Sequence, residues 1–173
     1  MGNLKILSMG CASGEEPYSL ALLWKERFEI IYPQFGLSIL ATDINKNMLE
    51  RAKGGKYKWS SFREVPDEIL KKFFKIDDEF HTLDQAIRER VEFKRHDLIH
   101  DESFRAIDII LCRNLAFTYF SKESQIEVLK KIAESINKEG YLVIGKDESL
   151  PITYPTFFVP IFSAGNIYQK FTE

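Results

Sequence analysis

Short apolar runs recur along the chain between longer amphipathic stretches. Runs of five or six residues rich in Leu, Ile and Val predict strands, and they occupy residues 4–9, 37–42, 91–96, 107–112 and 141–145. The run at 107–112 (IDIILC) is almost continuously apolar. That pattern is typical of a parallel strand that is buried on both faces.

Apolar residues at helical spacing predict four helices between these strands, at residues 15–31, 45–53, 67–74 and about 122–137. Ser121 is predicted to cap the last helix, and Pro33, Gly54 and Gly140 stand where helices are expected to stop. Glu127 and Lys131 are predicted to form an exposed ion pair on it. Residues 75–90 alternate poorly and predict either a small hairpin or an irregular cover.

Two further β segments follow, at residues 157–162 and 166–171, and predict an antiparallel hairpin joined around Ala164 and Gly165. Strands that alternate with helices predict an open α/β sheet with helices on both faces and right-handed crossovers. The expected architecture is Rossmann-like, with a mostly parallel seven-stranded sheet and an antiparallel C-terminal hairpin. We expect residues 1–173 to form a single domain, because no repeat, linker or low-complexity tract interrupts them.

Composition narrows the class of protein. The chain has 173 residues, of which 45% are hydrophobic and 29% charged, as in an ordinary globular domain. A net charge of −2 offers no broad electrostatic surface for nucleic acid or an anionic membrane. No apolar stretch approaches the roughly 18 residues of a membrane span, and residues 1–7 lack the pattern of a secretory signal. We therefore expect a cytoplasmic protein that does not insert into membranes.

Cysteines and histidines give no strong chemical signal. Cys11 and Cys112 are too few for a disulfide framework, so we interpret them as reduced thiols, with a redox pair as the weaker alternative. The three histidines do not form a recognised metal spacing. We interpret the cluster at residues 96–101 (HDLIHD) as a polar strand end, and no metal is predicted.

Chemistry-bearing residues follow four predicted strands directly. Residues 10–16 (GCASGEE) follow the first strand, Asp43 the second, Asp97 the third, and Arg113 with Asn114 the fourth. Ligands of open α/β sheets bind outside the carboxyl ends of the strands. The sequence therefore predicts a ligand site at the edge of the sheet where the carboxyl ends of the parallel strands meet, which we call the rim.

The loop at residues 10–16 indicates what kind of ligand binds there. Its small residues allow the backbone to approach a ligand closely. A nicotinamide cofactor fits poorly, because the G-x-G-x-x-G pattern needs a glycine where Ala12 stands, and no GK[ST] phosphate motif is present. Glu15 and Glu16 make the loop acidic, which suits a cofactor with an amine and a sulfonium, such as S-adenosylmethionine.

Two carboxylates can complete a nucleoside site. Asp43 is suited to accept hydrogen bonds from two ribose hydroxyls, and its alternative role is to cap the helix that starts near Asn45. Asp97 is suited to bind the adenine amino group, and its alternative role is that of a solvated turn residue.

Several motifs together resemble one family. The segments GCASGEEPYSLAL, ILATDINKNMLERAKGGKY, VEFKRHDL, DIILCRN followed by YF, and EGYLVIGKDESL occur in the order found in the CheR family of chemotaxis receptor methyltransferases. The resemblance runs from Leu4 to about Tyr168 and implies a Rossmann-like class I methyltransferase domain. The implied reaction is methyl-ester formation on glutamate side chains of a receptor or other signalling protein.

The resemblance also implies roles for individual residues. It assigns S-adenosylmethionine, and its product S-adenosylhomocysteine, to the loop and to Asp43 on the ribose. Glu15 then lies near the methionine portion and Asp97 beside adenine. The full implied cofactor set is Gly10, Cys11, Ala12, Ser13, Gly14, Glu15, Asp43, Asp97, Leu98 and Asn114. Arg113 and Tyr119 are implied to face the methyl acceptor.

A carboxylate acceptor is consistent with the residues present. It is ionised near pH 7, so its attack on a sulfonium methyl needs no general base, and no histidine occurs in the GEEPYS or CRN elements. Arg113 can hold a carboxylate through a forked pair of hydrogen bonds; the alternative is a structural salt bridge. Tyr119 can orient an acceptor oxygen; it can also simply pack, and Thr118 is the competing polar residue because four residues separate CRN from YF.

The sequence also departs from the family pattern. The chain begins at its first strand, without the family's helical N-terminal domain, so we expect an open site. Residues 73–92, where the family carries a small β-subdomain that docks receptor tails, are short and predict at most a reduced insertion. Two other functions therefore stay open: a non-catalytic module that binds S-adenosylmethionine or S-adenosylhomocysteine, and a methyltransferase for a small-molecule acceptor.

Overall fold

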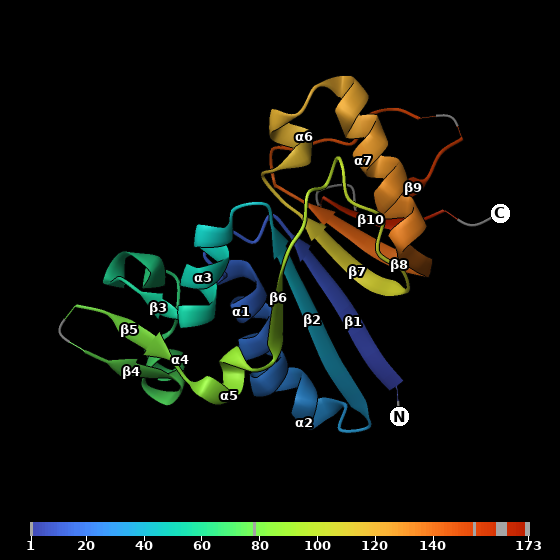
Figure 1. The fold of residues 1–173 in the computed structure, drawn as a ribbon. Coiled ribbons are helices and arrows are strands. Elements are labelled where there is room, and N and C mark those ends of the chain that lie inside the picture. Colours follow the sequence, from blue (N-terminus) through green and yellow to red (C-terminus); the bar gives the residue numbers. More distant parts are fainter. Residues whose placement is uncertain (1, 78, 154, 162–165, 172–173) are drawn as a thin grey trace.

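Most of the strands lie in one twisted sheet (Figure 1). The computed structural model describes residues 2–77, 79–153, 155–161 and 166–171. Within these residues the sheet has the order β6-β2-β1-β7-β8-β10-β9. Its members are β1 (Gly2–Met9), β2 (Phe35–Asp43), β6 (Val91–Arg95), β7 (Ile107–Cys112), β8 (Ile136–Ile144), β9 (Phe158–Pro160) and β10 (Ile167–Lys170).

Parallel pairing joins the first five of these strands, and β10 pairs antiparallel with both β8 and β9. This confirms the predicted mostly parallel seven-stranded sheet with an antiparallel C-terminal hairpin. The turn predicted around Ala164 and Gly165 lies outside the described residues. None of the described helices is both long enough and apolar enough to cross a membrane.

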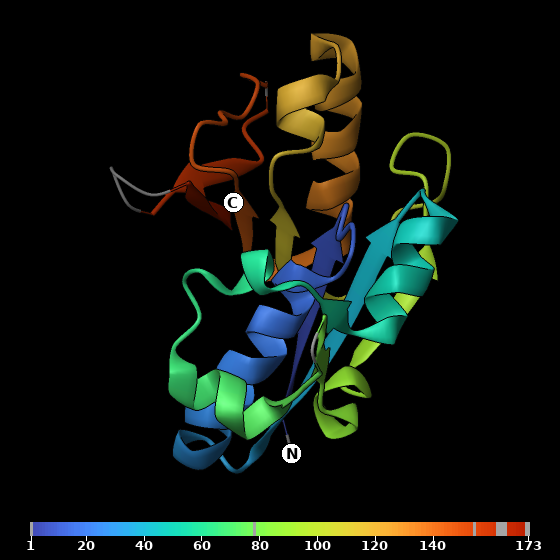
Figure 2. The same cartoon turned by 90° about the vertical axis from the view of Figure 1, so that its left-hand side faces the viewer.

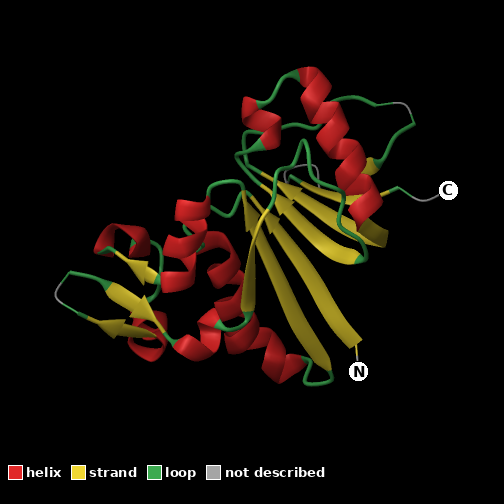
Figure 3. Ribbon diagram, viewed as in Figure 1, coloured by secondary structure: helices red, strands yellow, loops and turns green. Residues whose placement is uncertain are grey.

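Helices cover both faces of the sheet, as Figures 2 and 3 show. Successive side chains of a strand point to opposite faces, so neighbouring residues of β1 enter different cores. Ile6 packs with α1 (Glu15–Leu23) and α3 (Lys46–Gly54), whereas Leu7 packs with α7 (Lys122–Ser135). The prediction of a sheet buried on two sides is therefore confirmed.

Local sequence signals place most helix ends correctly. The helix predicted at 15–31 consists of α1, a π-helical turn (Trp24–Phe28) and α2 (Glu29–Ile31). The side chain of Asn45 caps α3, and that of Ser121 accepts the N–H of Ser124 at the start of α7. α4 occupies Asp67–Phe73.

The end of α7 differs from the prediction. The helix stops at Ser135 and β8 begins at once with Ile136, whose backbone is extended and whose side chain is buried. Gly140 therefore lies inside β8, beside the register shift opposite Ile107 and Ile109, and does not stop the helix. Pairing of Ile136 with Ile107 in the apolar core outweighs the local glycine signal.

The predicted ion pair on α7 is wrong. Lys131 turns away from Glu127, and its Nζ donates to the carbonyl oxygens of Ile99 and Asp101 at 2.6 and 2.7 Å. The chain between β6 and β7, residues 96–106, forms no helix or strand. Its carbonyl groups therefore need hydrogen-bond donors from other segments. Two charge-assisted hydrogen bonds to partly buried carbonyl groups stabilise this position of the Lys131 ammonium more than one exposed ion pair with Glu127 would.

A second, smaller sheet stands beside α3 and α5 (Figure 1). It contains β3 (Lys56–Tyr57), β4 (Phe74–Ile76) and β5 (His81–Leu83) in the antiparallel order β3-β5-β4. β4 and β5 form a hairpin within the segment whose structure the sequence left open, and α5 (Gln85–Arg88) leads from it to β6. The small sheet also contains a strand at 56–57, outside the predicted insertion at 73–92.

Candidate functional site

The loop after β1 is bent by residues in left-handed conformations. Gly10 and Gly14 have φ angles of 70° and 92°, which glycine adopts without steric cost. The N–H groups of Gly10 and Cys11 both donate to the carbonyl oxygen of Thr42, at 2.8 and 2.9 Å. A Cβ atom on Gly10 would lie 2.5 Å from the side chain of Leu115. The loop is thus tied to the end of β2 and lies closely under the turn after β7.

Asp43, at the end of β2, joins this loop to α3. One carboxylate oxygen accepts the N–H of Ala12 at 3.0 Å, and the other accepts the N–H of Asn45 at 2.8 Å. Ala12 has a φ of 45°, which is strained for a residue with a Cβ, so this hydrogen bond stabilises the loop. Asn45 itself caps α3. Each carboxylate oxygen can accept a second hydrogen bond, so the ribose role of Asp43 stays a prediction.

The two glutamates of the loop have different partners. Glu15 is exposed at the start of α1, and among the hydrogen bonds of the described residues its carboxylate accepts only that of Ser13 Oγ. Glu16 accepts Ser8 Oγ at 2.8 Å on one oxygen and pairs with Arg113 Nη1 at 3.2 Å on the other. The loop and Arg113, which are far apart in the sequence, therefore meet at the rim.

The turn after β7 is organised by a residue to which the sequence assigned no role. Glu148 is 8% exposed, and its carboxylate accepts the N–H groups of Asn114, Leu115 and Gly145. It also accepts the hydroxyl of Thr118 at 2.5 Å. Glu148 lies in the segment EGYLVIGKDESL, but it is separated from Asn114 by 34 residues, so no local spacing reveals the contact.

Thr118 and Tyr119 lie on the short helix α6 (Ala116–Tyr119) and face different surroundings. The Thr118 hydroxyl is occupied by Glu148, whereas Tyr119 is 74% exposed. Thr118 is exposed as well, so the two residues differ in the hydrogen bond to Glu148 and not in access from solvent. The role of Tyr119 as a substrate contact stays a prediction.

The carboxylate of Asp97 makes contacts within its own turn. One oxygen accepts the N–H groups of Ile99 and His100, and the other lies 2.9 Å from His100 Nδ1. The hydrogen bond from His100 is the main cause that lowers the pKa of Asp97 to about 2. Leu98 packs against the core on the α7 side of the sheet. The adenine roles of Asp97 and Leu98 stay predictions.

The other histidine of this cluster is buried. His96 lies 3.5 Å from Asp101, and burial lowers its pKa below the ordinary histidine value. Within the described residues, no group of three or more His, Cys, Asp or Glu side chains is arranged to hold a metal ion.

Both cysteines lie at this rim as free, buried thiols. Burial is the main cause that raises the pKa of each thiol to about 12, and the charge of Asp43 adds to the effect at Cys11. Thiols with such pKa values are poor nucleophiles at neutral pH.

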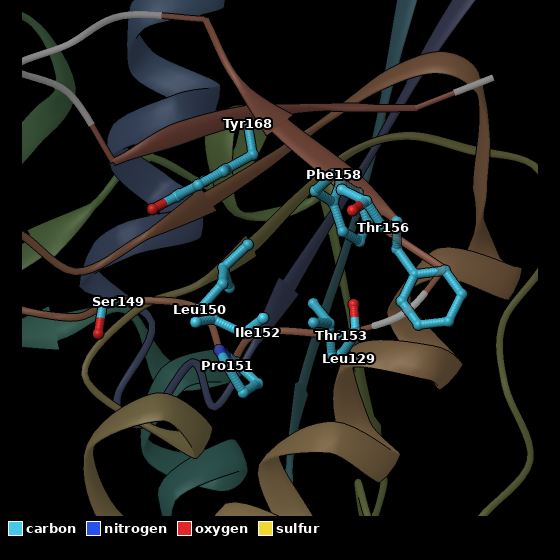
Figure 4. A pocket seen from close by; sticks show the side chains of 10 residues that line it. Leu129, Ser149, Leu150, Pro151, Ile152, Thr153, Thr156, Phe158 and Tyr168 are labelled. Carbon is cyan, nitrogen blue, oxygen red and sulfur yellow. The ribbon is translucent and has the colours of Figure 1, made fainter. Parts of the chain in front are cut away.

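Two cavities lie away from the loop. One of about 270 Å³ lies beside residues 149–153 and 156–158, where Leu150, Phe158 and Tyr168 contribute to its wall (Figure 4). An apolar groove of about 490 Å³ lies between α1 and the strands β1 and β2. Neither is lined by the glutamates of the loop, Asp43 or Arg113.

The residues at the rim fit S-adenosylmethionine. Three carboxylates, those of Glu15, Glu16 and Asp43, lie in the loop or bond to it, and the carboxylate of Glu16 pairs with the guanidinium of Arg113. This acidic set suits a ligand with a cationic amine and sulfonium and disfavours a pyrophosphate. The absence of a Cβ at Gly10 leaves room for the side chain of Leu115, and at Gly14 for those of Ala52 and Tyr57, so the two glycines allow the loop to pack closely against its surroundings.

Comparison with known families gives a match over most of the chain. The model described as "CheR methyltransferase, SAM binding domain" matches residues 1–164. The chain is 33% identical to a chemotaxis protein methyltransferase of Listeria monocytogenes over 149 residues, which is 86% of this chain and 55% of the relative. It is 32% identical to chemotaxis protein methyltransferase 2 of Vibrio cholerae, over 96% of this chain and 59% of the relative. The chain thus spans somewhat more than half the length of these two relatives.

Solved structures share the fold at low sequence identity. A TehB-like S-adenosylmethionine-dependent methyltransferase from Corynebacterium glutamicum aligns with a TM-score of 0.54 and 14% identity, over 98% of this chain and 79% of that one. Phosphoethanolamine N-methyltransferase 1 of Haemonchus contortus, in complex with S-adenosylhomocysteine, aligns with a TM-score of 0.52 and 14% identity, over 99% of this chain and 29% of that one. Both likenesses concern the fold alone.

Proposed function

The chain belongs to the CheR methyltransferase family and carries its S-adenosylmethionine-binding domain, and from this premise we propose that it methylates glutamate carboxylates of a protein. The relatives' names, chemotaxis protein methyltransferases, support a chemoreceptor or a related signalling protein as the acceptor. A cytoplasmic site of action is part of the same proposal.

The position of Arg113 carries the proposal. Glu16 holds its guanidinium at the edge of the cofactor loop, while 45% of the side chain stays exposed. A guanidinium offers several N–H donors in a planar fork that matches a carboxylate. An incoming carboxylate can therefore bind Arg113 on its open side, next to the cofactor loop.

The residues at the rim suffice for transfer to a carboxylate. When bound, S-adenosylmethionine supplies a methyl group on a positively charged sulfur, and the carbon–sulfur bond breaks as the carbon–oxygen bond of the ester forms. No residue of the chain needs to take a proton, because the acceptor is ionised near pH 7. Asp43 and the loop at 10–16 would hold the cofactor, and Glu15 would bind its amine. Arg113 would orient the acceptor carboxylate, and Tyr119 would donate a hydrogen bond to the same carboxylate. Positioning is the main contribution of the protein.

The proposal is tested by the chemical nature of the methylated product. The purified chain is incubated with S-adenosylmethionine labelled with tritium in the methyl group, together with a lysate of the cells from which the gene derives. Methyl esters release labelled methanol in mild base, whereas N-methyl and S-methyl groups do not. Mass spectrometry of the labelled proteins then identifies the methylated side chains.

The expected result is base-labile label on glutamate residues of a protein. Label that appears only in small solutes would replace the protein acceptor with a small molecule. Binding of S-adenosylhomocysteine without transfer of label would favour the non-catalytic module.

A further inference from the structure

Glu148 is a buried carboxylate with an unusually complete set of partners. Oε2 accepts the N–H groups of Asn114 and Gly145 at 2.8 and 2.6 Å. Oε1 accepts the N–H of Leu115 at 3.2 Å and the hydroxyl of Thr118 at 2.5 Å. A charged side chain that is 8% exposed is stable only when such hydrogen bonds replace water. Two of the four donors, Asn114 and Leu115, belong to the turn that follows β7, and a third, Thr118, lies on α6 directly after it.

The turn has an uncommon backbone conformation at Asn114. The φ of this residue is 50°, in the left-handed region, which asparagine enters more readily than most residues with a Cβ but which still needs support from its surroundings. The same relationship occurs on the opposite side of the site, where Asp43 accepts the N–H of Ala12, whose φ is 45°. Each of these two residues is thus held through its backbone by one carboxylate.

The turn connects Glu148 to both parts of the predicted site. Arg113 directly precedes Asn114 and pairs with Glu16. Leu115 directly follows Asn114, and its side chain lies so close to Gly10 that a Cβ there would clash with it. A change in the conformation of Asn114 therefore moves the origin of the Arg113 side chain and the contact with the cofactor loop.

From this arrangement we propose that Glu148 is a positioning residue for methyl transfer, which fixes the turn at 113–118 and thereby the direction of the Arg113 guanidinium. The proposal rests on the proposed function, because it assigns Arg113 to the acceptor. Glu148 itself is enclosed by the turn and acts on the acceptor only through Arg113.

The substitution Glu148→Gln tests this role with little change in shape. A glutamine has one acceptor oxygen, and its NH₂ group donates. With the NH₂ group at the Oε2 position, the N–H groups of Asn114 and Gly145 lose their acceptor. With the NH₂ group at the Oε1 position, the N–H of Leu115 loses its acceptor, whereas the Thr118 hydroxyl can rotate to accept from the amide. The control Asp147→Asn removes the same charge one residue away, where the side chain is exposed.

Four measurements separate positioning from general stability. We expect Glu148→Gln to remain folded by circular dichroism, and to exchange the amide hydrogens of Asn114 and Leu115 about tenfold faster or more by NMR. We expect the kcat for formation of base-labile methyl ester to fall by about 10²-fold, as misplacement of a reacting group by about 1 Å can cause. The Kd for S-adenosylhomocysteine should rise much less, by no more than about threefold, since Glu148 reaches the loop at 10–16 only indirectly, through the contact of Leu115 with Gly10. Asp147→Asn should match the unchanged protein in all four.

Retention of kcat within about twofold in folded Glu148→Gln would overturn the proposal. Equal losses of kcat and of S-adenosylhomocysteine affinity would also overturn it, because they indicate general damage to the site. Should the variant not fold, Thr118→Val takes its place: it removes one donor to Oε1, and unchanged exchange at Leu115 together with unchanged kcat would then count against the role. If the unchanged protein forms no methyl ester, the proposed function fails separately, and the exchange rates of Asn114 and Leu115 still decide whether Glu148 holds the turn.

Discussion

Arg113 donates through Nη1 to Glu16 Oε2 at 3.2 Å, so the turn after β7 and the loop after β1 share an ion pair. The second oxygen of Glu16 accepts the hydroxyl of Ser8, which is fully buried in β1. The hydrogen bond from Ser8 thereby fixes the Glu16 carboxylate against β1. The Glu16 carboxylate in turn holds the Arg113 guanidinium where the acceptor is proposed to bind.

Replacing Glu16 with glutamine is expected to weaken acceptor binding more than folding. The amide oxygen still accepts the Ser8 hydroxyl, but the charge that holds Arg113 is lost. Because the pair is partly exposed, the free energy of unfolding should fall by no more than about 1 kcal/mol. The KM for the acceptor protein should rise several-fold, measured by methyl-ester formation at saturating S-adenosylmethionine. An unchanged KM would contradict a positioning role for Glu16.

Removal of the Arg113 side chain should affect methyl transfer and leave cofactor binding intact. For Arg113→Ala we expect methyl-ester formation to fall about 10²-fold, because the charged hydrogen-bond donor for the acceptor is gone. Arg113→Lys should be intermediate, since lysine keeps the charge without the fork. Calorimetry with S-adenosylhomocysteine should give an unchanged Kd, and Arg105→Ala, at an exposed arginine outside the rim, serves as the control. Equal losses in transfer and affinity would remove Arg113 from the acceptor site.

Tyr119 offers a test that barely perturbs the fold. Its side chain is 74% exposed, so Tyr119→Phe should change the free energy of unfolding by less than about 0.5 kcal/mol. If the hydroxyl orients the acceptor, the rate of methyl-ester formation should fall about tenfold with normal S-adenosylhomocysteine affinity. A rate equal to that of the unchanged protein would indicate that Tyr119 has no role in transfer.

Substitution of Asp43 should reduce cofactor affinity directly. In Asp43→Asn one oxygen becomes an NH₂ group that cannot accept the N–H of Ala12 or Asn45. Loss of a ribose acceptor and displacement of the loop should together raise the Kd for S-adenosylhomocysteine about tenfold or more.

A matched control separates loss of the site from loss of a helix-start hydrogen bond. Asp84 accepts the N–H of Ala86 at 2.7 Å at the start of α5, which precedes β6 and makes no hydrogen bond to the loop among the described residues, so Asp84→Asn removes a similar contact outside the site. Both variants should lose about 1 kcal/mol of stability. Only Asp43→Asn should lose affinity, and equal affinities for the two variants would argue against the assigned cofactor site.

The buried thiols predict slow alkylation. A pKa raised to about 12 leaves almost no thiolate at pH 8, because the protonated form dominates far below the pKa. In the folded protein Cys11 and Cys112 should therefore resist iodoacetamide at pH 8, and both should react once the protein is unfolded in guanidinium. Mass spectrometry counts the modified residues, and rapid modification of the folded protein would contradict the assigned burial.

Much of the fold was predictable from local pattern. The strands at 4–9, 37–42 and 107–112 and the cap at Ser121 follow from side-chain periodicity and from groups that satisfy helix ends within a few residues. The cap of α3 is Asn45 and not Asp43, the capping residue considered from the sequence. The same patterns misplace the end of α7, where pairing between Ile136 and Ile107 overrides Gly140. A glycine marks a possible helix end within a few residues of the chain. Strand pairing joins residues that are far apart in the sequence and leaves no such local mark.

The candidate site was predictable in outline only. Alternation of strands and helices is enough to bring the loop at 10–16, Asp43 and Arg113 to one rim, because the carboxyl ends of parallel strands share an edge. Their partners were not predictable, since hydrogen bonds such as those of Lys131 to the carbonyl groups of Ile99 and Asp101 leave no periodic trace.

By itself the sequence determined the order of strands and helices, the acidic small-residue loop and the polar residues that end each strand, because these depend on neighbours along the chain. Only the tertiary structure decided that Glu16 holds Arg113, that Glu148 holds Asn114, and that the Thr118 hydroxyl donates to Glu148. These contacts join side chains from different elements, and they form only when packing of the two cores brings the ends of β1, β7 and β8 together.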